Sequence, residues 1–186
     1  MGAGVLPFAR LDGQVLFLLQ TVFSGRKSGF LNDFGGGVDP GETEMGAAAR
    51  EFVEETETMY LAADPATARR TPSTVEAQLP RVEALFSATL AVNPGWWCER
   101  QSPDPLKPKQ WKTFFIEFPY RDVSVMNRLW ALDSSGRYRK RRELHWLPAE
   151  QLLHLYSRTP DRLWKRVRQL RDATGVIRAI QRSESN

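Results

Sequence analysis

The sequence of 186 residues has little of what covalent cross-links and metal centres usually need, since it contains one cysteine and two histidines. Cys98 has no partner for an internal disulfide, and His145 and His154 are too few to complete a structural zinc site with it. The sequence also lacks a secretory signal pattern and any apolar run of about 18 residues. We therefore expect a cytoplasmic protein in a reducing compartment, with no membrane segment.

The composition is that of a globular protein, with 41% hydrophobic and 26% charged residues. The length suits one domain, expected over residues 1–182, with an insertion at about 64–80, a basic C-terminal helix at about 160–182 and a short tail at 183–186. Charge is divided unevenly, because residues 1–136 carry a net −4 and residues 137–186 a net +8. An acidic part can attract divalent cations and a basic part phosphates, so both together suit metal-bound phosphates.

Short apolar runs bounded by turn residues predict the strands. Residues 5–9 and 15–21 flank Asp12-Gly13 and are expected to form a hairpin. Further strands are expected at residues 30–34, 82–92, 112–118 and 144–147, with a loop rich in Pro and Trp between the second and third of these.

Apolar residues at helical spacing predict the helices. The strongest signal starts at Thr43 and continues to about residue 61, with Met45, Ala48 and Phe52 on one face. Other helices are expected at residues 72–79, at 148–156 and from residue 160 onward, where Gly175 is expected to interrupt the last one. Strands alternating with helices place the chain in the α/β or α+β class.

The helix that starts at Thr43 also carries a dense group of carboxylates beside its apolar face. At about 100° per residue, Glu51, Glu54 and Glu55 fall on one arc. Like charges one turn apart repel, and a divalent cation reverses that penalty. Hard oxygen ligands suit Mg²⁺ or Mn²⁺. A solvated acidic face is the alternative interpretation.

The loop before this helix, residues 35–42, begins with three glycines, which let the backbone approach a ligand and lead to a helix N-terminus that favours phosphate. Loop and helix together give a pattern of fixed spacing, Gly36-x5-Glu42-x7-Arg50-Glu51-Phe52-x-Glu54-Glu55-x-Glu57-Thr58. This pattern resembles the Nudix hydrolase signature, the box that expects Gly-x5-Glu-x7-Arg-Glu-apolar-x-Glu-Glu-x-Gly-apolar. The flanking strands and a late Trp146-Leu147-Pro148 extend the resemblance to about residues 5–156.

The resemblance implies an α/β/α sandwich, with a mixed sheet between helices, that cleaves pyrophosphate links. It implies Mg²⁺ or Mn²⁺ held by Glu51, Glu54 and Glu55, with the carbonyl of Gly35 as a further ligand. It also implies that Arg50 acts in the site and pairs with Glu42, with Gly36 and Glu42 shaping the loop. Metal ions would neutralise the phosphates and activate water, so no protein nucleophile is needed.

Two box positions depart from the family pattern, because Glu57 stands where Gly is expected and Thr58 where an apolar residue is expected. The Gly normally ends the helix in a left-handed conformation. With Glu57 in its place, the helix is expected to continue toward Ala63.

The general base is open at this point. It is either one of the box glutamates or a carboxylate from a later loop, for which Glu143, Glu117 and Glu99 are candidates. For Glu143, a surface ion pair with the neighbouring arginines is an equal alternative.

The basic run at residues 136–142, with Arg139 and Arg141, is either a solvated loop or a phosphate-binding segment. Together with the three glycines it is similar to the diphosphoinositol polyphosphate phosphohydrolase branch of the family. A nucleotide would instead need an aromatic stacking partner, for which Trp97 leads and Trp96 and Trp111 are options. Capped RNA is a third possibility, suggested by the basic residues of the last helix, Arg162, Lys165, Arg166 and Arg168.

The sequence therefore predicts a Mg²⁺-dependent hydrolase that cleaves a pyrophosphate bond in a nucleoside diphosphate linked to another group. Its expected partner is a small phosphoanhydride substrate, with RNA and a homodimer as further options. Diphosphoinositol polyphosphates and capped RNA are the alternative substrates. A hypothesis of another class is a silent Nudix module that binds a nucleotide or RNA, with Glu57 as the feature in its favour.

Overall fold

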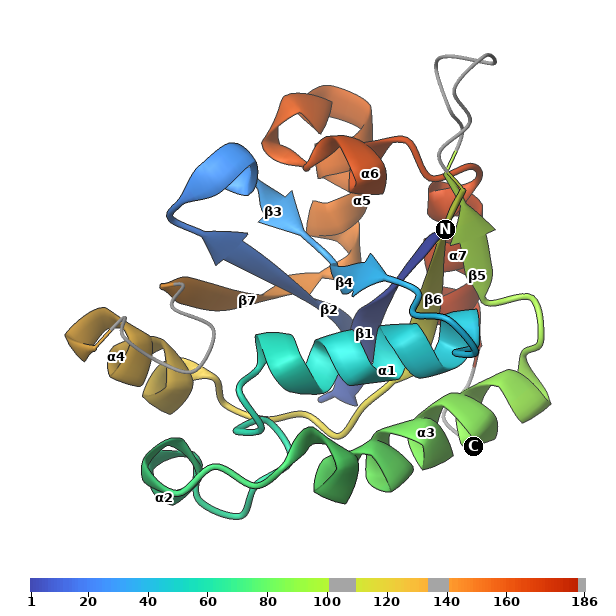
Figure 1. Ribbon diagram of the computed structural model, residues 1–186. Helices are drawn as coiled ribbons and strands as arrows, with labels where there is room; N and C mark the ends of the chain where they lie inside the picture. The colour runs from blue at the N-terminus through green and yellow to red at the C-terminus, as the bar shows by residue number, and fades with distance from the viewer. Residues whose placement is uncertain (101–109, 134–140, 184–186) are drawn as a thin grey trace.

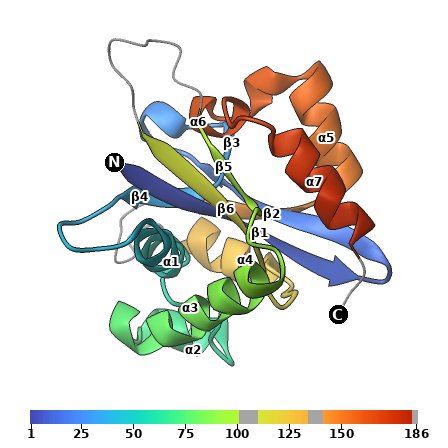
Figure 2. The ribbon, with the colours of Figure 1, turned by 90° about the vertical axis from the view of Figure 1, so that its right-hand side faces the viewer.

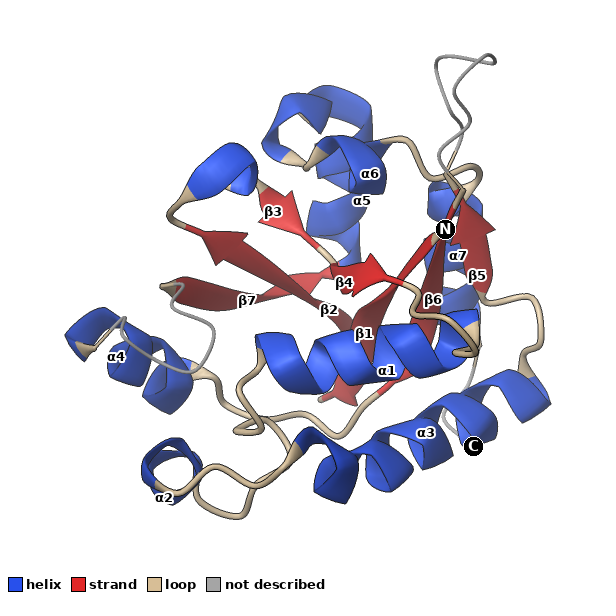
Figure 3. Cartoon of the chain, viewed as in Figure 1, coloured by secondary structure: helices blue, strands red, loops and turns tan. Residues whose placement is uncertain are grey.

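The computed structural model describes residues 1–100, 110–133 and 141–183. These residues form a seven-stranded mixed sheet with helices on both faces (Figures 1 and 3). The strands are β1 Gly2–Leu11, β2 Gln14–Val22, β3 Leu31–Asn32, β4 Phe34–Gly37, β5 Trp97–Glu99, β6 Trp111–Glu117 and β7 Arg142–Pro148. The main order is β3-β2-β1-β6-β5; β4 also pairs with β1, and β7 with β2. Only the β1–β6 pair is parallel among the described strand pairs.

The helices divide between the two faces, as Figure 2 shows. One face carries α1 Glu44–Glu55, α2 Pro65–Arg70, α3 Val75–Val92 and α4 Ser124–Leu132. The other carries α5 Ala149–Arg158, α6 Lys165–Arg168 and α7 Ala173–Arg182, with short 3-10 turns at η1 Gly25–Lys27 and η2 Pro160–Arg162. Each face has its own buried apolar cluster. The expected α/β class, with a mixed sheet between helices, is confirmed.

The first hairpin forms as predicted, and its turn explains why. Asp12 and Gly13 both have positive φ, at 49° and 76°, which is the combination that a two-residue hairpin turn requires. The expected strands at 30–34, 112–118 and 144–147 are also present, the first of them divided into β3 and β4.

The segment at residues 82–92, predicted as a strand, is the second half of α3. The buried residues Val82, Phe86 and Thr89 lie four and three positions apart, which places them on one face of a helix. The helix begins where the Thr74 hydroxyl accepts a hydrogen bond from the Ala77 N–H, and it continues through Pro80. The predicted helix at 72–79 is thus the start of a longer one, and the expected end of the insertion at residue 80 falls inside α3.

The C-terminal helix predicted from residue 160 is divided into η2, α6 and α7. The break lies at residues 169–172, where Asp172 takes a left-handed φ of 56°. Gly175, expected to interrupt the helix, lies inside α7, where a Cβ would overlap the Asp172 carboxyl group. Leu163, Val167 and Leu170 are buried.

Helix α1 ends at Glu55, so the expectation that it continues toward Ala63 is wrong. Glu57 and Thr58 have φ values of 50° and 60°, and the Thr58 N–H bonds to the Val53 carbonyl while the Glu57 N–H bonds to that of Glu54. This is the pair of hydrogen bonds that closes a helix through a left-handed residue. Glu57 therefore takes the conformation that a glycine takes at this position.

Tertiary contacts hold Glu57 in that conformation. Its side chain is buried, one carboxylate oxygen accepts a hydrogen bond of 3.0 Å from the Trp130 indole N–H, and the other forms an ion pair with Arg69. Trp130 belongs to α4 and Arg69 to α2, so one side chain joins the end of α1 to two other helices. The strain of a left-handed non-glycine residue is about 1–2 kcal/mol, which these contacts offset.

We predict that Glu57→Gly lowers the free energy of unfolding by about 2 kcal/mol, because relief of strain is outweighed by the loss of the acceptor for the buried Trp130 indole and of the ion pair with Arg69. Urea unfolding followed by circular dichroism measures it. Asp12→Gly is the matched control: it also removes a positive-φ non-glycine residue, but at an exposed turn, and it should change stability by less than about 1 kcal/mol. Equal effects of the two substitutions would contradict this account.

Candidate active site

The box residues lie where α1 packs against β4 and β1 (Figure 1). Strand β4 pairs antiparallel with β1, with Gly35 opposite Gly4 and Gly36 opposite Ala3. Helix α1 starts after Thr43, whose hydroxyl accepts a hydrogen bond of 3.0 Å from the Gly46 N–H. The glycine-rich strand and the acidic helix therefore face each other directly.

Arg50 fixes the loop between them. Its Nε and Nη2 donate to the two carboxylate oxygens of Glu42 at 2.9 and 3.0 Å, and Nη2 also donates to the Gly37 carbonyl at 2.9 Å. The guanidinium group lowers the pKa of Glu42 below its usual range, chiefly through the hydrogen bonds between them. The Arg50–Glu42 pair implied by the family resemblance is thus present, and its fork geometry holds the loop at both ends.

Glu51 and Glu54 both lie close to one nitrogen of the Arg50 guanidinium group. Their Oε1 atoms are 3.3 and 3.4 Å from Nη1 of Arg50. Burial raises the pKa of Glu51, and the nearby Glu55 carboxylate raises it further, against the opposing effect of Arg50. The carboxyl group of Glu51 lies where a Cβ on residue 36 would be, so a side chain at this position would displace that carboxyl group.

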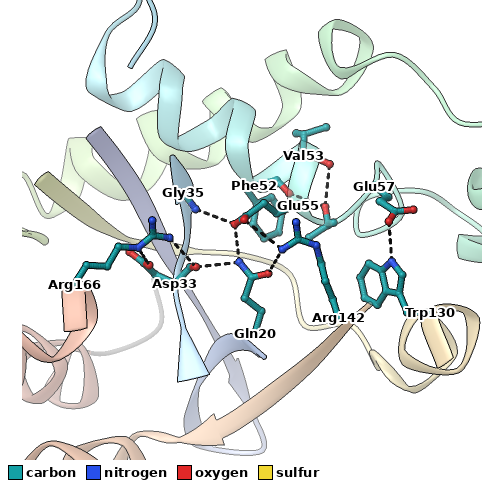
Figure 4. A network of polar contacts seen from close by, with 11 residues as sticks. Gln20, Asp33, Gly35, Phe52, Val53, Glu55, Glu57, Trp130, Arg142 and Arg166 are labelled. Carbon is teal, nitrogen blue, oxygen red and sulfur yellow. Dashed lines mark hydrogen bonds and ion pairs between the residues drawn. The ribbon is translucent and has the colours of Figure 1, made fainter. Parts of the chain in front are cut away.

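Glu55 is held by three donors (Figure 4). Its Oε2 accepts hydrogen bonds from the Gln20 side-chain amide at 2.6 Å and from the Gly35 N–H at 2.9 Å, and its Oε1 is 3.2 Å from Nη1 of Arg142. Gly35 thus contacts Glu55 through its N–H group. The glycines of β4, interpreted from sequence as a ligand cradle, are needed first for close approach by protein atoms.

Gln20, Arg142 and Asp33 were missed by sequence reasoning, and all three are buried. Arg142 donates to the Gln20 carbonyl oxygen, and the Gln20 amide donates to the Asp33 backbone carbonyl as well as to Glu55. The Asp33 carboxylate pairs with Nε of Arg166 at 2.6 Å and accepts from Thr113 at 2.9 Å. A polar residue in the middle of an apolar strand, as Gln20 is in β2, was the signal available.

Glu143 does not lie with the box carboxylates. It is opposite Thr21 in the β2–β7 pairing, and strand alternation places it on the other sheet face from Arg142 and Leu144. The other two candidates for the general base are also elsewhere: Glu117 is 3.5 Å from Arg10, and Glu99 is on the edge strand β5.

The candidate substrate-binding residues are dispersed. Arg139 lies outside the described residues, and the Arg141 guanidinium group stacks on Phe23, 4.5 Å from the ring centroid. Trp97 is partly exposed on β5, with Lys112 Nζ 4.1 Å from its ring centroid, and Lys112 pairs with Glu44 in the first turn of α1. Trp97 therefore lies near the start of α1.

Across residues 1–100, 110–133 and 141–183, no three His, Cys, Asp or Glu side chains converge closely enough to hold a metal ion. Within the same ranges, no helix has both the length and the apolar character needed to span a bilayer.

Comparison with protein-family models finds no match for the sequence, and comparison with curated proteins finds none either. Among solved structures, an Ap4A hydrolase from C. elegans is 16% identical, with 96% of this chain and 93% of that chain aligned and a TM-score of 0.49. A Nudix hydrolase from Alicyclobacillus acidocaldarius is 19% identical, with coverages of 96% and 89% and a TM-score of 0.45. RenU, from M. smegmatis, is 17% identical, with coverages of 81% and 72% and a TM-score of 0.42. The last two are Nudix hydrolases by name, and that is the family which residues 36–58 of this chain resemble.

Proposed function

We propose that this protein is a Nudix pyrophosphohydrolase that depends on Mg²⁺ or Mn²⁺ and cleaves a nucleoside diphosphate linked to another group. One observation carries the proposal: the box residues, spaced over 36–58 in sequence, meet at a single place between α1 and β4. Arg50, Glu51 and Glu55 each contact a residue of the glycine strand or its loop. A solvated acidic face, the alternative interpretation of these glutamates, does not require such contacts.

The donor set fits a hard divalent cation in kind, because Glu51, Glu54 and Glu55 supply carboxylate oxygens from one side of one helix. The raised pKa of Glu51 supports this, since burial beside another carboxylate disfavours its charged form and a cation would favour it. When bound, such an ion would neutralise phosphate charge and lower the pKa of an attacking water molecule.

Residues of the protein hold the loop and the carboxylates of the site in place. Arg50 connects the two ends of the loop at residues 37–42, because it donates to the Gly37 carbonyl and to the Glu42 carboxylate. Gln20, the Gly35 N–H and Arg142 orient the Glu55 carboxylate, because all three donate to it. Glu54 is the most exposed of the three carboxylates, so we assign it as the candidate general base.

The silent-module hypothesis loses its main support. Glu57 was the feature in its favour, yet the structure ends α1 with the backbone conformation that the family glycine would take. The substitution at residue 57 therefore gives no reason to expect the box carboxylates to be displaced.

The first test is release of mononucleotide or phosphate by the purified protein from ADP-ribose, dinucleoside polyphosphates, nucleoside triphosphates, capped RNA and diphosphoinositol polyphosphates. We expect cleavage of a nucleoside diphosphate derivative that stops with EDTA and resumes with excess Mg²⁺ or Mn²⁺. Binding of one of these compounds without turnover would replace the hydrolase proposal with the silent module.

Glu54→Gln should lower kcat at least about a hundredfold, because it removes a charge and a proton acceptor from the site. The free energy of unfolding should change by less than about 1 kcal/mol, since the side chain is partly exposed. Glu83→Gln, the same substitution at an exposed position of α3, is the control and should keep full activity. Retained activity in Glu54→Gln would remove this residue from the site.

Gln20→Met should lower kcat about tenfold with little change in KM, because the nearly isosteric side chain removes the amide that orients Glu55. Steady-state kinetics at saturating Mg²⁺ measures both constants. The control is Thr21→Val, at the next residue of β2. It removes the 3.1 Å hydrogen bond between Thr21 and His145 and should leave kcat unchanged. Parallel losses in both variants would point to general damage to β2.

A further inference from the structure

A groove of about 850 Å³ runs between α5 and α7, on the face of the sheet opposite α1 (Figure 2). The Glu150 carboxylate in the first turn of α5 accepts a hydrogen bond of 2.8 Å from the Gln181 amide in the last turn of α7, so the two helices pack antiparallel. Because the axes of packed helices are about 8–10 Å apart, the groove between them is narrow. The other lining residues that matter here are Leu153, His154, Tyr156, Arg178 and Arg182.

Cations line this groove. Arg178 and Arg182 are exposed and lie one turn apart on α7, and His154 of α5 lines the opposite wall. No carboxylate among the described residues forms an ion pair with either arginine. The acidic residue of the wall, Glu150, lies at one end of the groove and bonds to the neutral Gln181. Two cations without a counter-charge favour an anionic occupant.

The positive charge continues beyond the groove. Over residues 149–183, seven Lys and Arg side chains are exposed, against three exposed carboxylates, Glu150, Asp161 and Asp172. Asp161 is already paired with Arg168 at 2.8 Å. Arg158, the last residue of α5, is one of the further exposed cations and directly follows the lining residues of that helix. An anion held in the groove can therefore extend onto further cations, which favours a polyanion over a single small ion.

The groove lacks the apolar anchors that an acidic helix would need. Leu153 and Tyr156 are partly buried in it, and the Tyr156 hydroxyl donates to the Val167 carbonyl at 3.1 Å. The large apolar side chains exposed on the described residues all lie outside α5, α6 and α7: Met1, Phe23, Val92, Trp97, Tyr120 and Leu132. A helix that docks in a groove does so through a row of apolar side chains. The partner indicated here is one that binds through its charges.

We propose that the groove binds the phosphate backbone of a single-stranded nucleic acid through Arg178 and Arg182. Each phosphate of a strand carries a negative charge, and a guanidinium group binds phosphate through two parallel N–H donors. A single strand suits the width of the groove, whereas a duplex, whose major groove alone is about 12 Å wide, does not. Since no exposed aromatic ring lies on the described walls to stack a base, binding is independent of base sequence. The proposal does not rest on hydrolase activity, because the groove and the box lie on opposite faces of the sheet.

The test is fluorescence anisotropy of a labelled oligouridylate of about 12 nucleotides titrated with the full chain. EDTA is present, so that metal-dependent cleavage does not consume the probe. Wild-type protein should bind the oligouridylate and an oligoadenylate of equal length with Kd values within about threefold of each other. The binding constant should fall as the salt concentration rises, because each phosphate contact releases counterions.

Arg178→Ala and Arg182→Ala should each raise the Kd about fivefold at low salt. Each should also make the slope of log K against log salt shallower by about 0.7, the value for one phosphate contact of a single strand. Arg178→Lys keeps the charge and should restore the Kd to within about threefold of wild type. Arg168→Ala is the matched control, because it changes the net charge equally at an exposed residue that is already paired with Asp161; its Kd should stay within about twofold.

No binding by wild-type protein, or equal losses in Arg178→Ala and Arg168→Ala, would overturn the assignment. Competition separates nucleic acid from other polyanions. Displacement of the labelled strand by polyglutamate at an equal concentration of charged groups would assign the groove to an acidic polypeptide instead. Equal displacement by inorganic tripolyphosphate would assign it to free phosphate chains. Displacement by unlabelled oligouridylate but by neither of these competitors would support the proposal.

Discussion

The site depends on two buried ion pairs, each between a carboxylate from the acidic part of the sequence and an arginine from the basic part. Glu55 and Asp33 come from the acidic part of the sequence and have little or no exposure, so each needs a cation beside it. Arg142 and Arg166 come from the basic part and supply those charges. Removing either arginine would leave a buried carboxylate without its counter-charge, which is the costly way to break a buried ion pair. The uneven charge along the sequence is thus explained in part by these ion pairs, in which arginines of the basic part neutralise buried carboxylates of the acidic part.

Gln20 connects the two ion pairs, because an amide both donates and accepts. Its NH₂ group bonds to Glu55 and to the Asp33 carbonyl, while its oxygen accepts from Arg142. A carboxylate in its place could not donate to Glu55, and an apolar side chain could do neither. This one residue of β2 therefore sets the orientation of a carboxylate on α1, and it couples α6 to the site across the sheet.

The sequence alone is enough to predict the elements whose conformation is determined by neighbouring residues in the chain. The hairpin follows from Asp12-Gly13, and the box helix follows from its start at Thr43 and its apolar spacing. It was insufficient where tertiary contacts decide. Residues 82–92 have strand-like composition but lie in a helix, because their apolar positions match helical spacing against the sheet. The roles of Arg142 and Arg166 were hidden because basic residues in a run are usually solvated, and only the fold brings buried carboxylates to them.

Glu57 is the strongest case of a distant contact deciding a local conformation. Local propensity disfavours a left-handed glutamate, and on that basis the helix should continue. Trp130 and Arg69 together reverse that preference, since the buried indole N–H needs an acceptor and the guanidinium group gains an ion pair, neither of which glycine can offer. The family position is therefore filled by a residue that meets the same backbone requirement and adds a tertiary contact. The helix end that places Glu54 and Glu55 is held here by contacts to α2 and α4 rather than by a glycine, so the geometry of the site depends on these two helices.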